Sequence, residues 1–350
     1  MENKKYIPVD IVNKGKPKLI MRYYKSETEL KGILVFVHGV SHGAWCWEKF
    51  VDYFTEIGYA CFAINLRGHG DNDENDIKGA QLSDYVTDVI RCIDYIENHH
   101  DDIKIDIPYS KPYIIGHSMG GAIVEIYISK YSNEVKGAVL FAPATAQGMG
   151  KSIFTTTVTK TGFNTMPTTR GHKPNKHLAE SNFFIAKDKD TKKFVPRITD
   201  ETELKYYDDQ LCKESTKAMF DLRKFTLNKN INIPVFVIGS NKDAYFPEDS
   251  LKSTANFYDT EPMILRGLCH DMMLDPEMEK AVESVLEFLE NPSELKNNPK
   301  EFIDNLENNI YPYDNTQWNN SFKAGWCSGY AATTFSVLLN SKFMRLFIDS

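Results

Sequence analysis

The sequence lacks several features that would place it outside the ordinary globular proteins. No apolar run reaches the length of about 18 residues that a membrane-spanning helix needs, and the first residues, Met-Glu-Asn-Lys-Lys-Tyr-Ile-Pro, carry no apolar signal segment. The six cysteines are scattered without a Cys-x-x-Cys pair, a pattern that favours free thiols in a reducing compartment over disulfides or zinc. These absences predict a cytoplasmic protein with no transmembrane segment.

An excess of positive charge is also missing. Lysine and arginine number 41 against 48 acidic residues, which gives a net charge of -7, so nucleic acid is a poor partner for this chain. There is no internal repeat of about 20 to 50 residues and no heptad register, which excludes solenoids and coiled coils. With 350 residues, of which 42% are hydrophobic, the chain can form one large domain with an insertion or appendage.

Short apolar segments alternate with amphipathic ones over most of the chain. The stretch 81–97 has apolar residues at helical spacing. The alternation predicts an α/β fold with a mostly parallel, doubly wound sheet. Its central strands are predicted at six apolar segments, namely 33–37, 60–66, 112–115, 137–142, 234–238 and 262–265.

Two regions interrupt the alternation and divide the chain. Residues 145–229 are rich in threonine and lysine and show helical patches without a clear strand, so we expect an inserted helical cap between core segments 1–144 and 230–291. Residues 292–350 form a C-terminal extension of unknown role. Its apolar end favours packing on the core or on a second subunit, and also allows peripheral membrane contact. The sequence leaves the oligomeric state undetermined.

The segment Gly116-His117-Ser118-Met119-Gly120 follows a predicted strand and precedes an apolar helix. This strand–turn–helix context is typical of a nucleophile elbow. The tight turn strains the serine backbone, and the small neighbouring glycines let other chain segments approach it. Ser118 is therefore the predicted nucleophile, placed where the helix N-terminus favours developing negative charge.

A serine nucleophile needs a histidine base and a carboxylate that orients the base, in the chain order serine, acid, histidine. Asp243 follows the predicted strand 234–238, and His270 follows the strand 262–265. Both fall at the carboxyl edge of the sheet, where ligands of α/β proteins bind. Asp249 and Asp271 remain alternatives for the acid.

A tetrahedral intermediate also needs two backbone donors. One comes from the residue after the nucleophile, which is Met119, and the other from the loop after the early strand 33–37, where Val40 is the candidate. His42, Trp45 and Trp47 follow this loop and either line the entrance of the site or pack in the core.

From about residue 32 to 290 the chain resembles the α/β-hydrolase superfamily. The resemblance rests on His38-Gly39, Arg67-Gly68-His69-Gly70, the elbow, Asp243 and His270 in matching order. It implies the α/β-hydrolase fold and a supporting role for Arg67 and His69 beneath the elbow. The segment from His38 to Trp47 is similar to plant methylesterases and hydroxynitrile lyases, whereas Arg-Gly-His-Gly and the elbow resemble bacterial esterases and monoacylglycerol lipases.

Four positions refine this resemblance. Ser118 stands where epoxide hydrolases and haloalkane dehalogenases of this fold use aspartate, which excludes both. Asp271 follows His270 where the lyases have lysine, which disfavours cyanohydrin cleavage. Cys269 replaces the usual glycine, and Asn65 replaces a common aspartate; we interpret both as packing variation.

The sequence thus predicts a serine hydrolase that cleaves a small-molecule carboxylic ester, small or acylglycerol-like, through an acyl-enzyme without metal or organic cofactor. The same triad could act on a thioester, an amide or a carbon–carbon bond, and a receptor-like ligand-binding protein is the alternative outside enzymes. Apolar residues of the cap form either its own core or a wall for the acyl group; they are Phe154, Phe163, Met166, Phe183, Phe184 and Ile185.

Overall fold

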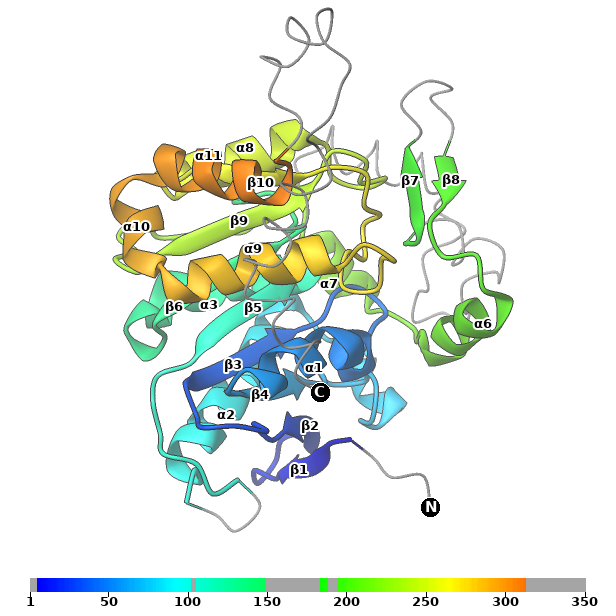
Figure 1. The fold of residues 1–350 in the computed structure, drawn as a ribbon. Helices are drawn as coiled ribbons and strands as arrows, with labels where there is room; N and C mark the ends of the chain where they lie inside the picture. Colours follow the sequence, from blue (N-terminus) through cyan, green and yellow to red (C-terminus); the bar gives the residue numbers. More distant parts are fainter. Residues whose placement is uncertain (1–4, 102–104, 149–182, 188–193, 313–350) are drawn as a thin grey trace, which may run out of the picture. The chain divides into compact units, whose positions relative to one another are not determined.

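A computed structural model describes residues 5–101, 105–148, 183–187 and 194–312. Residues 1–310 belong to one compact unit, and the chain divides after Ile310. The first unit is built around an eight-stranded sheet of order β1-β2-β4-β3-β5-β6-β9-β10 (Figure 1). The strands are β1 (Ile7–Ile11), β2 (Leu19–Tyr24), β3 (Gly32–Val37), β4 (Tyr59–Ile64), β5 (Tyr113–His117), β6 (Gly137–Phe141), β9 (Val235–Ser240) and β10 (Pro262–Leu265).

The parallel part of the sheet confirms the prediction from the sequence. All six predicted strands are present as β3, β4, β5, β6, β9 and β10, and neighbouring members of this set pair in parallel. Two further strands, β1 and β2, form an antiparallel edge beside β4 and were not predicted. The alternating exposed and buried residues of β1 are typical of an edge strand exposed on one side, whereas β2 is buried along most of its length.

Helices cover both faces of the sheet because successive strand residues point to opposite sides. Val35 belongs to the core that includes residues of α2 and α3, whereas the adjacent Phe36 packs against Phe50 and Phe54 of α1. The helices of the core are α1 (Glu48–Glu56), α2 (Leu82–Asn98), α3 (Met119–Tyr131), α8 (Glu248–Phe257) and α9 (Glu279–Glu290), with 3-10 turns at Ala44–Trp47, Glu74–Ile77 and Ser132–Glu134. Helix α2 confirms the amphipathic stretch 81–97.

The segment between β6 and β9 contains both helices and strands. Helices α6 (Glu201–Gln210) and α7 (Thr216–Asp221) agree with the predicted helical patches, but β7 (Ile185–Lys187) and β8 (Phe194–Pro196) form a short antiparallel pair that the sequence analysis did not predict. Three-residue strands are too short to show a period-2 pattern. The predicted limits of the cap remain predictions, and Phe154, Phe163 and Met166 lie outside the described residues.

Two helices follow the last core helix. They are α10 (Pro292–Asn297) and α11 (Pro299–Ile310), and Phe302 of α11 packs edge-on against Phe236 of β9, with ring centroids 6.1 Å apart. The start of the predicted extension therefore packs on the sheet, and residues 313–350 lie outside the described part. No helix among the described residues combines the length and apolar character that crossing a bilayer requires.

Candidate active site

Ser118 occupies a strained turn between β5 and α3. Its backbone angles are φ 55° and ψ −117°, an unfavourable combination for a residue with a side chain. Glycines make this turn possible because the chain packs tightly around them. A Cβ atom on Gly120 would lie 2.4 Å from the carbonyl oxygen of Val37, and one on Gly116 would lie 2.4 Å from the carbonyl oxygen of Gly120.

Asp243 and His270 lie on the loops that follow β9 and β10, and the fold brings them into direct contact. His270 Nδ1 is 2.8 Å from Asp243 Oδ2. The other carboxylate oxygen, Oδ1, accepts the backbone amides of Tyr245 at 2.6 Å and Phe246 at 3.1 Å. These bonds fix the plane of the carboxylate, so it can hold the imidazole in one orientation.

The surroundings of His270 favour its charged form. Burial lowers the pKa of this histidine, but the adjacent carboxylate of Asp243 outweighs burial, Asp271 adds to its effect, and the pKa is raised above its ordinary value. The ring centroids of Tyr245 and Phe246 lie 4.8 and 5.5 Å from the centroid of the His270 imidazole. They shield the pair from water.

The elbow and the His270 loop meet through His117. Its Nε2 lies 3.2 Å from the carbonyl oxygen of His270, and the two imidazole centroids are 4.7 Å apart. Within the described ranges, Ser118 and His270 share no side-chain hydrogen bond, and Ser118 is 8% exposed. In ligand-free enzymes this contact often forms only when substrate binds.

Val40 and Met119, the predicted oxyanion donors, both lie beside the elbow. Met119 is the first residue of α3, and Val40 follows Gly39, whose Cα is so close to the elbow that an added Cβ would lie 3.0 Å from Ser118 Cβ. Neither amide donates a hydrogen bond to another residue of the described chain. Both N–H groups are therefore available to a ligand oxygen.

Of the two alternative acids, neither bonds the His270 ring. Asp249 lies in the first turn of α8. Asp271 is fully buried and lies 2.9 Å from Nε2 of His42, and its second oxygen is 3.5 Å from Nε2 of His117. Burial raises the pKa of this carboxyl, but His42 outweighs burial and the pKa is lowered. Asp243 is thus the carboxylate bonded to the His270 ring, and Asp271 is bonded to His42 instead.

His42, Trp45 and Trp47 are packing residues of the interior. All three are at most 1% exposed, and Trp45 stacks on His42 with ring centroids 5.2 Å apart. Of the two interpretations that the sequence allowed, the structure therefore supports core packing for this group.

Glu214 is a buried carboxylate that the sequence analysis missed. Its Oε2 accepts the backbone amide of Ser41 at 3.2 Å and lies 3.0 Å from His69 Nε2, while Oε1 accepts the Tyr85 hydroxyl at 2.6 Å. Burial lowers the pKa of His69, but Glu214 outweighs burial and the pKa is raised. Glu214 lies in the segment between β6 and β9, where no motif marks it.

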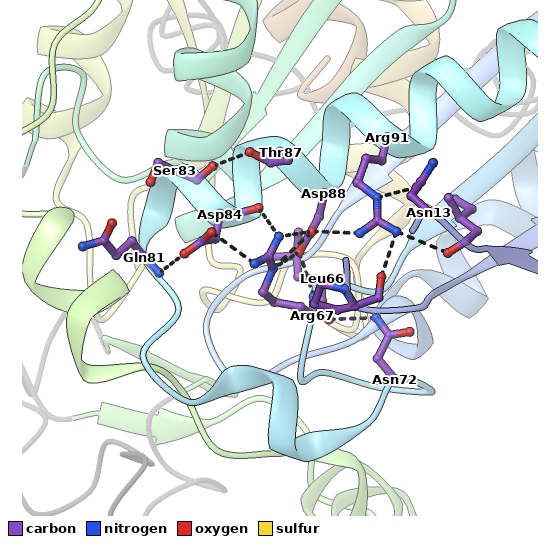
Figure 2. A network of polar contacts seen from close by, with 12 residues as sticks. Asn13, Leu66, Arg67, Asn72, Gln81, Ser83, Asp84, Thr87, Asp88 and Arg91 are labelled. Atoms are coloured by element: carbon purple, nitrogen blue, oxygen red, sulfur yellow. Dashed lines mark hydrogen bonds and ion pairs between the residues drawn. The ribbon is translucent and has the colours of Figure 1, made fainter. Parts of the chain in front are cut away.

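Arg67, on the loop after β4, bonds two carboxylates of α2. Its guanidinium lies between two carboxylates of that helix, 2.7 Å from Asp88 Oδ1 and 3.1 Å from Asp84 Oδ1 (Figure 2). Figure 2 also shows Asn72 bonded to the carbonyl of Leu66 at 3.0 Å. Arg67 and His69 therefore hold the loop after β4, and their support of the elbow, which the resemblance implied, stays a prediction.

Asn65 shows why an amide suits a position where aspartate is common. Its Oδ1 accepts the amide of Ala44 at 2.7 Å, and its Nδ2 donates to the carbonyl of Ile20 and to Asp71, both at 3.0 Å. A carboxylate could not make the last two bonds, because it has no proton to donate.

The segment between β6 and β9 contacts the His270 loop directly. The amide of Asp271 donates to the carbonyl of Phe183 at 3.3 Å, and the Phe183 ring lies 4.9 Å from His42. Phe183 therefore packs at the site rather than only within the cap.

Arg197, from the same segment, bonds both oxygens of buried Asp275 at 3.0 and 2.9 Å, and Asp275 accepts the amide of Cys269 at 2.9 Å.

One group of side chains has the composition of a metal site. Potential ligand atoms of His117, His270 and Asp271 lie within 4.8 Å of one another, and all three residues are buried. Each residue already has a protein partner: the carbonyl of His270 for His117, Asp243 for His270, and His42 for Asp271. The group is accounted for as a hydrogen-bonded network around the histidine base.

The fold is that of the α/β-hydrolases. An esterase from Exiguobacterium antarcticum superposes with a TM-score of 0.62 at 16% identity, covering 81% of this chain and 100% of that chain. A monoacylglycerol lipase from Paleococcus ferrophilus superposes with a TM-score of 0.57 at 17% identity, covering 78% of this chain and 99% of that chain. At these identities the likeness shows the fold alone.

The chain belongs to the family described as serine aminopeptidase, S33, whose model matches residues 28–277. The monoacylglycerol lipase of Mycolicibacterium smegmatis is 28% identical over 130 residues, which are 37% of this chain and 44% of the relative. The putative methylesterase 11, chloroplastic, of Arabidopsis thaliana is 34% identical over 111 residues, 31% of this chain and 26% of the relative. The alignments thus span less than half of either relative, and these relatives are lipases and esterases, as predicted.

Proposed function

We propose that this protein hydrolyses a carboxylic ester through a covalent acyl-enzyme on Ser118. The observation that carries the proposal is the 2.8 Å bond between His270 Nδ1 and Asp243 beside a serine held in a left-handed elbow. This arrangement supplies a nucleophile, a base and an orienting carboxylate, which are the parts that serine hydrolysis needs.

The reaction has two steps. His270 Nε2 takes the hydroxyl proton of Ser118 while the serine oxygen attacks the ester carbonyl, and the oxyanion accepts hydrogen bonds from the amides of Val40 and Met119. His270 then gives its proton to the leaving alcohol. In the second step His270 takes a proton from water, whose oxygen attacks the acyl carbon. His270 then returns this proton to the oxygen of Ser118 as the bond between serine and acyl group breaks and the acid leaves. Asp243 keeps the proton of His270 on Nδ1 and stabilises the imidazolium.

We infer a small or acylglycerol-like ester as substrate, because the relatives with matching segments are a monoacylglycerol lipase and methylesterases. An amide is the second candidate, since the family is described as a serine aminopeptidase. The triad chemistry is the same for both bonds, so the enclosing residues decide between them.

The direct test is labelling with a fluorescent fluorophosphonate, followed by turnover of p-nitrophenyl esters of rising chain length and of aminoacyl p-nitroanilides. We expect labelling of the wild-type protein and its loss in Ser118→Ala and His270→Ala. Labelling that persists in Ser118→Ala would contradict the assignment of the nucleophile. Turnover of the anilides without any ester turnover would replace the esterase proposal with the amide one.

A ligand-binding protein with the same fold is the alternative outside enzymes. Stoichiometric fluorophosphonate labelling without turnover of any ester or amide would favour it. Measurable multiple turnover at a rate that depends on Ser118 supports the enzyme.

We also infer a reducing, cytoplasmic environment. The five cysteines within the described ranges are all free thiols, and four of them are buried. Buried thiols behave as small apolar side chains and need no disulfide.

A further inference from the structure

Each ring nitrogen of His42 lies at hydrogen-bond distance from an acceptor oxygen. Nδ1 lies 2.6 Å from the carbonyl oxygen of Val40, and Nε2 lies 2.9 Å from the carboxylate of Asp271. Both partners are acceptors, and a neutral imidazole has only one N–H. The two contacts are hydrogen bonds at the same time only when each ring nitrogen carries a proton, and the charged imidazole then forms an ion pair with Asp271.

The peptide between Val40 and Ser41 is held at both ends. Its carbonyl accepts Nδ1–H of His42 at 2.6 Å, and its N–H donates to Glu214 at 3.2 Å. Ser41 itself has a φ of 64°, a conformation that a residue with a side chain adopts only when its surroundings enforce it. The carbonyl of Gly39, on the preceding peptide, lies 2.8 Å from His38 Nδ1.

These contacts determine where the Val40 N–H points. In a trans peptide the N–H is opposite the carbonyl, so the bond from His38 to the Gly39 carbonyl sets the direction of the Val40 N–H. The bond from His42 to the next carbonyl prevents the loop from rotating about Val40. Stabilisation of an oxyanion depends on donors that are fixed before the reaction.

We propose that the pair formed by His42 and Asp271 positions the oxyanion loop, which comprises residues 38–42 after β3. The adjacent residues His270 and Asp271 then serve the two parts of the reaction, the attacking serine and the oxyanion. The proposal rests on the function proposed above. His270 acts on the serine, while Asp271, through His42 and the Val40 carbonyl, holds the amide that receives the oxyanion. His42 and Asp271 are positioning residues and do not touch the substrate.

Other groups around the pair are consistent with a fixed position. His117 Nε2 lies 3.5 Å from the second oxygen of Asp271, and the backbone amide of Asp271 is held by the carbonyl of Phe183. Trp45 stacks on one face of His42, and Phe183 contacts the ring edge-on. The pair is fully buried, so its bonds do not compete with water.

The test is Asp271→Asn, which keeps the shape of the side chain and removes its charge. A neutral imidazole has one N–H, and when it is on Nε2, bonded to the new amide oxygen, the Val40 carbonyl has no donor. We expect kcat for a p-nitrophenyl ester to fall about 10- to 100-fold with KM little changed, because an oxyanion donor acts in the transition state. Affinity for a trifluoromethyl ketone, whose adduct carries the oxyanion, should fall by the same factor. Rates are compared on the pH plateau, where His270 is fully deprotonated.

Asp88→Asn is the matched control. Asp88 is also a fully buried carboxylate paired with a cation, Arg67, but it lies on α2, and its partners among the described residues are Arg67 and Arg91. We expect this variant to lose stability without losing kcat per labelled active site. If Asp271→Asn does not fold, the double variant His42→Phe with Asp271→Asn removes both charges and leaves no buried unpaired ion.

The outcomes separate this proposal from the proposed function. Ketone affinity and kcat that fall together in Asp271→Asn or in the double variant support the positioning role. Unchanged kcat and ketone affinity in a folded variant overturn it, as does an equal loss of kcat in Asp88→Asn. Full activity in Ser118→Ala would instead remove the proposed function itself.

Discussion

The elbow at Ser118 and the loop at His270 are held by different forces. The elbow is fixed by the backbone, since a left-handed serine is enclosed by glycines that leave no room for a Cβ. The His270 loop is fixed by side chains distant in sequence, with Asp243 on the imidazole and Arg197 on Asp275. Steric constraints are local and act at any pH, whereas ion pairs depend on tertiary structure and on protonation.

The largest expected effect concerns Asp243. In Asp243→Asn the side-chain amide can donate to His270 and stabilise the wrong tautomer, so kcat should fall about 10³- to 10⁴-fold. Steady-state hydrolysis of a p-nitrophenyl ester measures this. Asp249→Asn, at an exposed carboxylate on α8, is the control and should retain wild-type kcat. A large loss of kcat in Asp249→Asn together with wild-type kcat in Asp243→Asn would instead identify Asp249 as the acid of the triad.

Gly120→Ala tests whether tight backbone packing fixes the elbow at Ser118. The new Cβ would lie 2.4 Å from the carbonyl oxygen of Val37 and 2.5 Å from that of His38, two backbone atoms that cannot move freely. We expect a loss of about 2–3 kcal/mol in the free energy of unfolding, measured by urea denaturation. In Gly32→Ala the nearest atoms belong to the Tyr59 ring at 3.4 Å, so the loss should stay below about 1 kcal/mol. Equal losses would argue against steric control of the elbow.

Arg197→Met tests whether the ion pair between Arg197 and Asp275 fixes the His270 loop. The variant removes two bonds to buried Asp275, and we expect a loss of about 1–2 kcal/mol at pH 7. Burial raises the pKa of Asp275, but Arg197 and two amides outweigh burial and lower it. The stabilisation is therefore present above the ordinary aspartate pKa and is lost as the pH falls through the lowered value, so the effect of the variant should shrink in acid.

The control for Arg197 is Lys49→Met, at an ion pair with Glu203 on the surface. Exposed pairs contribute less than about 1 kcal/mol. Denaturation of both variants at neutral and acidic pH checks the prediction. A loss for Arg197→Met that does not depend on pH would show that packing of its side chain, and not its charge, holds the loop.

The smallest effect is a shift in the pH profile. Because the pKa of His270 is raised by Asp243 and further by Asp271, kcat/KM should rise with pH through a midpoint above the ordinary histidine value of about 6.5. Asp271→Asn should move this midpoint to lower pH, and Asp88→Asn should leave it in place. A midpoint in Asp271→Asn at or above that of the wild type would contradict the contribution of Asp271.

The sequence predicted the parts that depend on local patterns. The six parallel strands, the helix at 81–97 and the elbow context were confirmed, because apolar periodicity and glycine positions act within a few residues. The edge strands β1 and β2 were missed, and so was the short pair β7 and β8. The half-exposed β1 and the three-residue β7 and β8 carry little apolar pattern, and the polar Arg22 interrupts the apolar residues of the buried β2.

The sequence also narrowed the acid to three carboxylates but could not tell what each one bonds. The sequence favoured Asp243 and left Asp271 as an alternative, and only the fold shows that Asp243 bonds the His270 ring while Asp271 bonds His42. Glu214 had no motif at all, yet it binds the Ser41 amide from a segment more than 170 residues away.

The sequence by itself determined the fold, the strained serine turn and the order of serine, acid and histidine, because these follow from short-range sterics and from hydrophobic periodicity. Only the tertiary structure decided which buried carboxylate pairs with which histidine, and that the segment after β6 supplies Glu214 and Arg197 to the site. A buried charge is stable only beside its partner, and the identity of that partner depends on how distant loops meet at the edge of the sheet.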